Sequence, residues 1–301
     1  MDFVKDLLMG GTSGCVAKTA CAPLERVKIV LQTQAADAST PKYNGMLACG
    51  QGIVKNHGVA ALWRGNLVNC SRYFPTQAIG FATKAKYQAM FVPKREEAGF
   101  ARWFAGFLLA GGLAGATALT VVYPLEFSYT RLAADVNNKK FTGLTDCVRK
   151  IARADGVQGL YRGYGPSVAG IIVYRAGYFG FYDAGKLMIW GEDPAAQRSA
   201  SFVARFGLAL CVDISAACFA YPLDTVRRRL MMQSGKAAEE VQYTSAFGAA
   251  SHILKHEGAG GFFKGVFANN VRAIASALVL VLYDEMKKMM DDGEGGGGHG
   301  H

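Results

Sequence analysis

The sequence predicts an all-α membrane protein in which six transmembrane helices form three repeats of about 100 residues. Three observations support this fold class. The composition is 51% hydrophobic and only 19% charged, which favours a membrane protein over a soluble globule. Six apolar segments are each long enough to cross a bilayer as a helix. Finally, a set of short motifs returns three times at nearly constant spacing.

The repeat is marked first by a proline followed two residues later by an acid. The prolines are Pro23, Pro124 and Pro222, separated by 101 and 98 residues. Downstream of each lies an aromatic–basic–glycine triplet: Trp63-Arg64-Gly65, Tyr161-Arg162-Gly163 and Phe263-Lys264-Gly265. Because both marks keep their order and spacing, we assign repeats to residues 1–99, 100–198 and 199–290 of a single domain.

Each repeat predicts two long helices joined by a long loop that carries a short amphipathic helix. The expected spans are Val4–Thr33, Leu67–Phe91, Trp103–Ala133, Ser167–Trp190, Phe202–Met232 and Ala268–Met289. The expected amphipathic helices are about Met46–Asn56, Leu144–Ala154 and Ala246–His256. Prolines inside three spans predict kinks, and the acidic, glycine-rich tail Asp291–His301 is expected to be disordered.

The distribution of charge predicts the orientation. The short loops hold four basic residues, Lys94, Arg95, Arg102 and Arg198, whereas the long loops and their flanks are richer in Lys and Arg. The positive-inside tendency places the long loops on the inner side and both termini on the outer side.

Four cations, Lys18, Arg72, Arg175 and Arg272, lie within the apolar spans. Burying a cation in lipid costs a few kcal/mol, so each needs a partner or a water-filled cavity. Snorkelling to the interface is the alternative, but it suits Lys18 poorly because that residue is far from the start of its helix. The cations therefore favour an anionic substrate near the midplane.

An aromatic stripe, Tyr174, Tyr178, Phe179 and Tyr182, follows helical spacing in the fourth span. Such a stripe is more often core packing, and the alternative is a cavity-facing ladder that stacks a base.

Acid–base pairs three residues apart recur beside the prolines, as in Glu25 with Lys28 and Asp224 with Arg227. Alone they are ordinary surface pairs. At three-fold related positions they could instead interlock between helices and close one mouth of a cavity. A second set, Tyr182-Asp183 with Lys186 and Tyr283-Asp284 with Lys287, could close the other mouth, which predicts alternating access.

Together these residues resemble the mitochondrial carrier family, and within it the ADP/ATP carriers, over about Phe3 to Met290. The supporting segments are Pro23-Leu24-Glu25-Arg26-Val27-Lys28, Arg72-Tyr73-Phe74-Pro75-Thr76-Gln77, Gly170-Ile171-Ile172-Val173-Tyr174-Arg175 and Arg227-Arg228-Arg229-Leu230-Met231-Met232. The resemblance implies exchange of ADP for ATP across the mitochondrial inner membrane, without metal, cofactor or chemistry.

The resemblance also implies roles for single residues. Phosphate binding falls to Lys18, Arg72 and Arg272, with Asn69 and Arg228 nearby, and the adenine pocket to Gly170, Ile171 and Tyr174. The implied matrix gate comprises Glu25, Lys28, Gln32, Glu126, Tyr129, Asp224 and Arg227, and the implied cytoplasmic gate is the second set above. Cardiolipin is implied at Gly65, Gly163 and Gly265, where helix N-termini would face phosphate.

The departures from the family pattern lie mainly in the gates. The basic position of the second repeat is Tyr129, so Glu25 is expected to receive only a neutral hydrogen bond. The outer ring of the first repeat has Ala85 and Gln88 where the other repeats carry the acid–base pair. Two alternatives therefore stay open: a weakly transporting or non-transporting relative that serves as a subunit of a respiratory complex, and a carrier of another nucleotide or anion.

The sequence contains no motif that indicates another function. The sequence has no glycine-rich phosphate loop before a helix, no Ser/His/Asp set and no metal-ligand spacing, so no enzyme is predicted. Although the net charge is +10, no basic run is interleaved with aromatics, so anionic lipid or an anionic substrate explains the charge better than nucleic acid.

Overall fold

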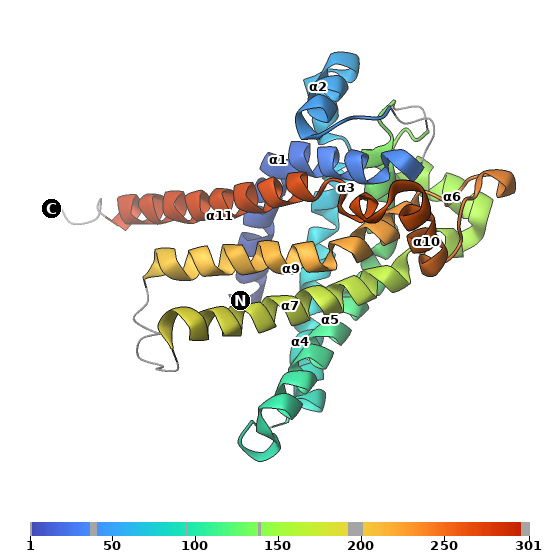
Figure 1. The fold of residues 1–301 in the computed structure, drawn as a ribbon. Coiled ribbons are helices and arrows are strands. Elements are labelled where there is room, and N and C mark those ends of the chain that lie inside the picture. The colour runs from blue at the N-terminus through green and yellow to red at the C-terminus, as the bar shows by residue number, and fades with distance from the viewer. Residues whose placement is uncertain (1, 37–40, 94, 138–139, 192–200, 296–301) are drawn as a thin grey trace.

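The computed structural model describes the backbone of residues 2–36, 41–93, 95–137, 140–191 and 201–295, and within these ranges the regular structure is entirely helical (Figure 1). The long helices are α1 (Asp2–Thr33), α4 (Tyr73–Phe91), α5 (Arg95–Ala134), α7 (Tyr164–Trp190), α9 (Phe202–Met231) and α11 (Val266–Gly295). The shorter α-helices are α2 (Met46–His57), α3 (Asn66–Ser71), α6 (Leu144–Gly159) and α10 (Ala246–Glu257). The predicted all-α fold is confirmed in the described part of the chain.

The expected helices differ from the observed ones mainly at their ends. The second span is divided into α3 and α4 at Arg72. Pro75 explains the break, because a proline has no N–H to donate to the carbonyl four residues earlier, here that of Ser71. The sixth span also runs on to Gly295, so residues 291–295 of the expected disordered tail are helical. Once a helix is formed, each further residue adds a hydrogen bond at little cost.

The three amphipathic helices α2, α6 and α10 lie at one end of the molecule, where the long helices meet (Figure 1). From this end the long helices diverge toward the short loops. Neighbouring helices pack most extensively as α7 with α9, α4 with α5 and α1 with α11.

The triplet glycines adopt the same backbone conformation in all three repeats. Gly65, Gly163 and Gly265 have φ values of 84°, 90° and 85°, which L-residues with side chains rarely adopt. Each also packs against a neighbouring helix. A Cβ atom at Gly163 would stand 2.7 Å from the Arg227 carbonyl oxygen. The glycines therefore allow both the turn into the next helix and its close approach to the neighbouring repeat.

Three buried arginines join the ends of α1, α5 and α9 in a cycle. Arg26 of α1 donates to the carbonyl oxygens of Ala133 and Asp135, both at 3.3 Å. Arg131 of α5 donates to that of Met232 at 3.0 Å, and Arg229 of α9 donates to that of Gln32 at 2.6 Å. Each arginine thus satisfies carbonyls that a helix C-terminus leaves unpaired, and the cycle returns to α1.

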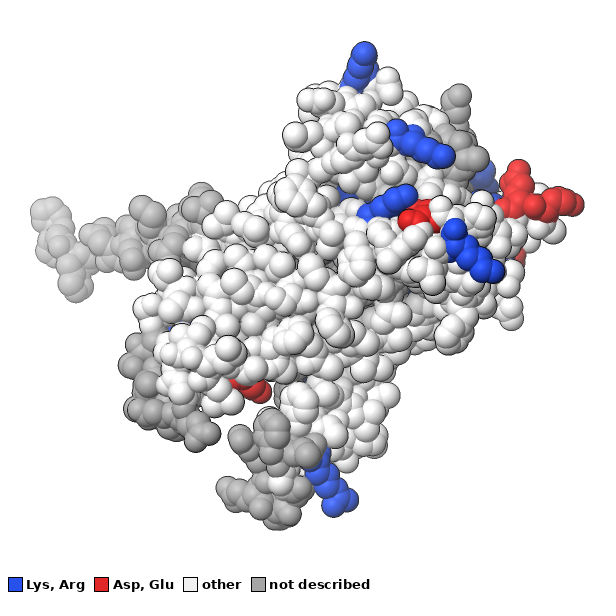
Figure 2. Space-filling model, viewed as in Figure 1, with Lys and Arg blue, Asp and Glu red and all other residues white. Residues whose placement is uncertain are grey.

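The outer surface agrees with a membrane location. On the face shown in Figure 2, charged side chains gather at the end formed by α2, α6 and α10, while the flank of α7 and α9 is almost free of charge. Exposed apolar side chains such as Ile172, Phe181, Val203 and Phe219 cover that flank. By length and hydropathy alone, two of the described helices qualify as membrane spans, Arg102–Ala134 and Phe202–Met231.

Candidate functional site

A cavity of about 680 Å³ lies between the long helices. Eight Lys and Arg side chains and three carboxylates line it, an excess of five positive charges. All four intramembrane cations predicted from the sequence, Lys18, Arg72, Arg175 and Arg272, are among them. Because the side chains face a cavity rather than lipid, the cations are placed where an anion can neutralise them.

Glycines on α5 make room for one of these cations. A Cβ atom at Gly111 would stand 2.9 Å from Nη1 of Arg175, and one at Gly115 would stand 3.2 Å from Ile171. These small residues therefore allow α7 to approach α5 closely.

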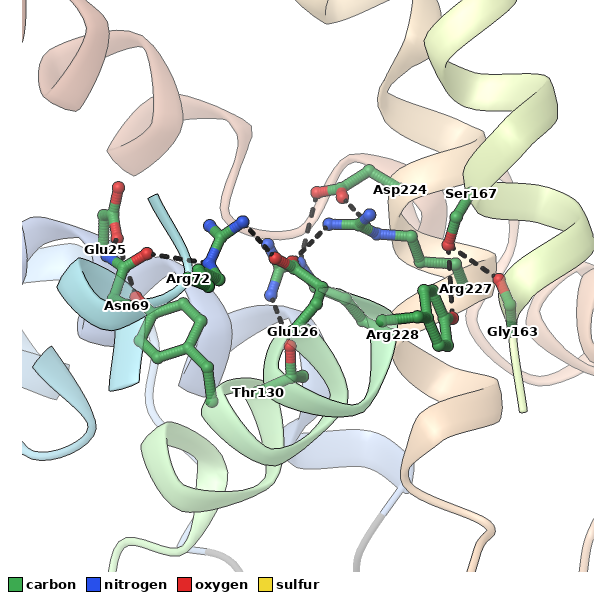
Figure 3. Close-up of polar contacts among 12 residues, drawn as sticks. Glu25, Asn69, Arg72, Glu126, Thr130, Gly163, Ser167, Asp224, Arg227 and Arg228 are labelled. Atoms are coloured by element: carbon green, nitrogen blue, oxygen red, sulfur yellow. Dashed lines mark hydrogen bonds and ion pairs between the residues drawn. The ribbon is translucent and has the colours of Figure 1, made fainter. Parts of the chain in front are cut away.

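The end of the cavity nearest the amphipathic helices is closed by contacts between α1, α5 and α9. Lys28 pairs with Asp224 at 2.9 Å, and Arg227 pairs with Glu126 at 3.1 Å. The Tyr129 hydroxyl donates to Glu25 at 2.7 Å. Each contact joins two different helices, and together they complete a ring; Figure 3 shows the part of it around Glu126 and Asp224.

Further hydrogen bonds strengthen this ring. The Gln32 side-chain amide donates to Asp224 at 3.1 Å and to Thr225 at 2.8 Å. Arg228 bonds Asp224 at 3.3 Å and Thr130 at 3.2 Å. Every expected member of the matrix gate therefore takes part in one connected network at this end.

Glu25 is the acid whose expected cation is missing, and three groups surround it. Besides Tyr129, the Asn69 amide donates to it at 2.7 Å, and Arg272 stands 3.9 Å away. Asn69, fully buried, also accepts a bond from Arg72 at 3.1 Å. Asn69, expected beside the substrate, thus lies behind the cavity wall and positions Glu25 and Arg72.

Two of the three expected phosphate-binding cations already pair with gate acids. Arg72 pairs with Glu126 at 2.6 Å, as Figure 3 shows. Arg272 lies beside Glu25. Lys18, by contrast, has its ammonium 5.5 Å from the centre of the Tyr73 ring. An anion entering the cavity would therefore compete with Glu126 and Glu25 for the two arginines.

A smaller pocket of about 200 Å³ opens between α7 and α9. Gly170, Ile171 and Tyr174, the residues expected to hold adenine, all line it. Ile171 and Tyr174 also line the main cavity, so the two spaces adjoin at these residues.

The aromatic stripe of α7 stacks largely on itself. Tyr178 and Tyr182 are parallel with ring centroids 6.1 Å apart, and Tyr178 meets Phe179 edge-on at 5.7 Å. Among the four stripe residues, only Tyr174 lines either of the two cavities described above. The stripe is therefore mostly packing, with one ring presented to the site.

The expected outer gate differs from the inner one. Lys186 pairs at 2.9 Å with Asp183 of its own helix, so this pair does not join two helices. The side chains of Tyr283, Asp284 and Lys287 lie outside the described residues. The structure thus has a closed end beside the amphipathic helices and an unjoined acid–base pair at the other.

Among the ionisable residues that sequence reasoning missed is Asp213 of α9. Its carboxylate accepts a hydrogen bond from the Tyr174 hydroxyl. The signal was present, because Asp213 interrupts an apolar run of a membrane span in the same way as the cations do.

Outside the spans, Glu257 holds two cations. Arg229 bonds it with two guanidinium nitrogens, the nearer at 2.6 Å, and Lys264 lies 2.6 Å away. Although partial burial opposes ionisation, these hydrogen bonds lower the pKa of Glu257 to about 2. Within the described residues, no group of three or more His, Cys, Asp or Glu could hold a metal ion.

Comparison with known proteins identifies the family. The pattern described as "Mitochondrial carrier protein" matches residues 1–95, 101–193 and 198–294. The chain is 49% identical over 294 residues to "Mitochondrial substrate carrier family protein ancA" of Dictyostelium discoideum, covering 96% of this chain and 94% of that protein. It is 48% identical over 300 residues to "ADP/ATP translocase 3" of Bos taurus, covering 96% and 98%. It is 47% identical over 299 residues to "ADP,ATP carrier protein" of Parachlorella kessleri, covering 97% and 86%.

Three matched repeats and relatives that align over almost their full length agree with the three-fold architecture and with the cationic cavity. The family consists of transporters, and its members are multi-pass proteins of the mitochondrial inner membrane. This chain belongs to the mitochondrial carrier family.

Proposed function

We propose that this chain exchanges ADP for ATP across the mitochondrial inner membrane by alternating access. The observation that carries the proposal is the cationic cavity closed at one end by a ring of interhelical contacts. An excess of five positive charges matches a ligand with three or four negative charges. The names of the relatives, ADP/ATP translocase and ADP,ATP carrier protein, support a nucleotide as that ligand.

The phosphates bind Lys18, Arg72 and Arg272, with Arg228 at the floor, and the base enters the smaller pocket at Gly170, Ile171 and Tyr174. The two adjoining cavities support this division, because one is strongly cationic and the other is narrow with several apolar and aromatic walls. When phosphate takes Arg72 from Glu126, the carboxylate loses an ion pair at 2.6 Å. Substrate binding thereby weakens the closed end and promotes opening.

The closed end acts as the matrix gate and the opposite end as the cytoplasmic gate. The basic long loops at the closed end support this orientation, with both termini facing the intermembrane space. The second gate uses Tyr182, Asp183 and Lys186 with Tyr283, Asp284 and Lys287. In this state Lys186 is paired within its own helix, as expected when the cytoplasmic gate is open.

Cardiolipin binds where Gly65, Gly163 and Gly265 precede the helices α3, α7 and α11. The left-handed conformation shared by the three glycines supports equivalent sites, and free N–H groups of a helix N-terminus suit phosphate.

The proposal is tested by exchange in liposomes. Purified protein is reconstituted with internal ATP, and uptake of labelled ADP is measured with and without internal nucleotide. We expect uptake only with internal nucleotide, and a dependence on membrane potential of about 2.3 kcal/mol per 100 mV, because one net charge moves per cycle. Uptake no greater than in protein-free liposomes would overturn the proposal.

A matched pair of substitutions tests the site. Arg72→Gln removes a cavity cation and should abolish exchange. Lys86→Gln removes an exposed cation of α4 that does not line the main cavity and should leave exchange unchanged. Equal loss in both variants would mean that overall charge, rather than the cavity, determines uptake.

The same assay tests the two alternatives that the sequence left open. A structural subunit of a respiratory complex predicts no exchange together with copurification of that complex. A carrier of another nucleotide or anion predicts uptake of another ligand in preference to ADP. The contact of Tyr129 with Glu25 favours the exchanger. Although this tyrosine stands at the basic position of the motif, it still joins α5 to α1.

A further inference from the structure

Asp213 is a membrane-embedded carboxylate to which the proposed exchange gives no role. It lies midway along α9 and is only partly exposed. The Tyr174 hydroxyl donates to its Oδ1 atom. Within the described part of the chain, no cation lies within ion-pair distance of it and no second hydrogen bond reaches it. Keeping an ionised carboxylate inside a membrane protein costs free energy unless a further hydrogen-bond donor approaches it.

The position of Asp213 along α9 relates it to the smaller pocket. Ala217, Ala220 and Asp224 follow Asp213 at intervals of four, three and four residues, which places all four on one face of the helix. The last three line the pocket. Asp213 therefore stands one turn beyond the lining residue Ala217, at the end of the pocket away from Asp224.

The wall of the pocket that α7 forms extends to the same end as Asp213. Gly170 and Tyr174 of α7 are four residues apart and both line the pocket. Small residues on both walls, Gly170 on one and Ala217 and Ala220 on the other, leave space for a flat ring between them, while Lys28, Asp224 and Arg227 line the opposite end of the pocket. The Tyr174 hydroxyl reaches from this wall to Asp213, so one phenol and, just beyond the lining residues, one carboxylate form a second polar end.

A carboxylate that already accepts one hydrogen bond offers its second oxygen as an acceptor only. Among the edges of a purine base, the exocyclic amino group is a donor, whereas an unsubstituted ring edge presents acceptors alone. The end of the pocket beside Tyr174 and Asp213 thus favours a purine with an amino group and disfavours one without it.

We propose that Asp213, anchored by Tyr174, accepts a hydrogen bond from the exocyclic amino group of the bound purine and so selects the base. This inference rests on the proposed nucleotide exchange and adds to it a residue that determines specificity. The phosphates and the base are then recognised separately, by cations in the main cavity and by a carboxylate at the end of the smaller pocket.

The test compares ADP with purine riboside 5′-diphosphate, which lacks the amino group and keeps the phosphates. We expect the wild-type chain to exchange ADP with a kcat/KM about fivefold or more above that of the analogue. Asp213→Leu should lower the value for ADP to that of the analogue and leave the analogue unchanged within about twofold. Asp213→Asn should retain most of the preference, because a carboxamide oxygen also accepts from an amino group.

Two further measurements separate base reading from a structural role. Ser215→Leu, a polar-to-leucine change at an exposed position of the same helix, should keep the wild-type preference. N6,N6-dimethyl-ADP, which has no N–H at this edge, should be exchanged by the wild-type chain no better than the analogue. The second result needs no substitution and so does not depend on the folding of a variant.

The outcomes distinguish this inference from the proposed function. Equal exchange of ADP and the analogue by the wild-type chain, or an equal fall for both ligands in Asp213→Leu, would overturn the role of Asp213 while exchange itself stands. No nucleotide exchange by the wild-type chain would overturn both. A preference for GDP that Asp213→Leu removes would support base reading by Asp213 and overturn the assignment of adenine.

Discussion

Replacing Tyr129 with arginine restores the cation that the gate ring lacks in the second repeat. In the structure, Glu25 receives bonds of 2.7 Å from both Tyr129 and Asn69, while the Arg272 guanidinium stands 3.9 Å away. Tyr129 is 4% exposed, so the introduced guanidinium would be largely shielded from water and would face the Glu25 carboxylate.

The magnitude follows from the interactions that the substitution replaces. A hydrogen bond between neutral partners contributes about 0.5–1.5 kcal/mol, and one to a charged group about 1.5–3 kcal/mol. Both the phenol and the guanidinium would bond a carboxylate, so the gain is the added Coulomb attraction. Two terms oppose this gain: the cost of burying a cation, and repulsion from Arg72, whose guanidinium carbon lies 5.8 Å from the centre of the Tyr129 ring. We expect a net stabilisation of the closed gate of about 1 kcal/mol, roughly a fivefold shift in population.

Thermal unfolding in detergent measures this change, and Tyr129→Phe is the matched control. For a chain of this size about 1 kcal/mol corresponds to a Tm change of about 2–4 °C. Tyr129→Phe removes the bond to Glu25, so the Tm values should fall in the order Arg, Tyr, Phe. The rate of exchange should be lowest for the arginine variant, because its gate opens less often. A Tm for Tyr129→Arg below that of Tyr129→Phe would refute the reasoning, since it would mean that Glu25 does not accept a cation from this position.

Three further predictions concern the parts around the site. Gly163→Ala should lower the free energy of unfolding by about 1–3 kcal/mol, because a Cβ there combines a φ of 90° with a 2.7 Å approach to the Arg227 carbonyl oxygen. Chemical denaturation measures this change. The control Gly165→Ala should be neutral or stabilising, because a Cβ at Gly165 would have no atom within 4 Å. Glu257→Gln should lower Tm at pH 7, and the difference should vanish as the pH falls from about 4.5 toward about 2, because the low folded-state pKa of Glu257 stabilises the fold only while the carboxylate is ionised. Cys49 and Cys147 are fully buried and burial raises the pKa of their thiols to about 12 and about 11, so mass spectrometry should find them unlabelled by maleimide at pH 7.5 until the chain is denatured.

Each of these has an outcome that contradicts it. Equal stability of the two alanine variants would show that Gly163 needs neither its turn nor its close approach. A Tm difference for Glu257→Gln that persists at pH 2, or one matched by the exposed Glu239→Gln, would exclude the ion pairs as its source. Labelling of Cys49 or Cys147 in the folded chain as fast as in the denatured chain would show that α2 or α6 opens readily.

The sequence was sufficient for the repeats and the position of nearly every helix, because apolar length and recurring motifs are local signals. The break at Arg72 could also have been read from Pro75, whose missing N–H acts on the residue four positions earlier. The membership of the inner ring was anticipated from residues on three separate helices, since three-fold repetition places equivalent residues at the same depth.

What the sequence could not supply is the contact made by each group. Arg72 was expected to bind a phosphate of the substrate, and in the structure it forms an ion pair with Glu126. Asn69 was expected beside the substrate and instead lies behind the wall. Asp213 stands out in the sequence only as one acid in an apolar run, and the folded chain alone brings it to Tyr174. Such pairings depend on rotamers and on helices far apart in sequence, which no periodicity encodes.

The cycle of arginines at the ends of α1, α5 and α9 has a consequence for chain connectivity. Arg26, Arg131 and Arg229 each cap the helix of the next repeat, and the last of them returns to Gln32 in the first repeat. The assembly thus has no terminal repeat in space, although the polypeptide has two ends. A circular permutant that begins at residue 100, with the original ends joined by a flexible linker, keeps all three caps. The order in which the repeats are synthesised can therefore change while the closed circle they form does not.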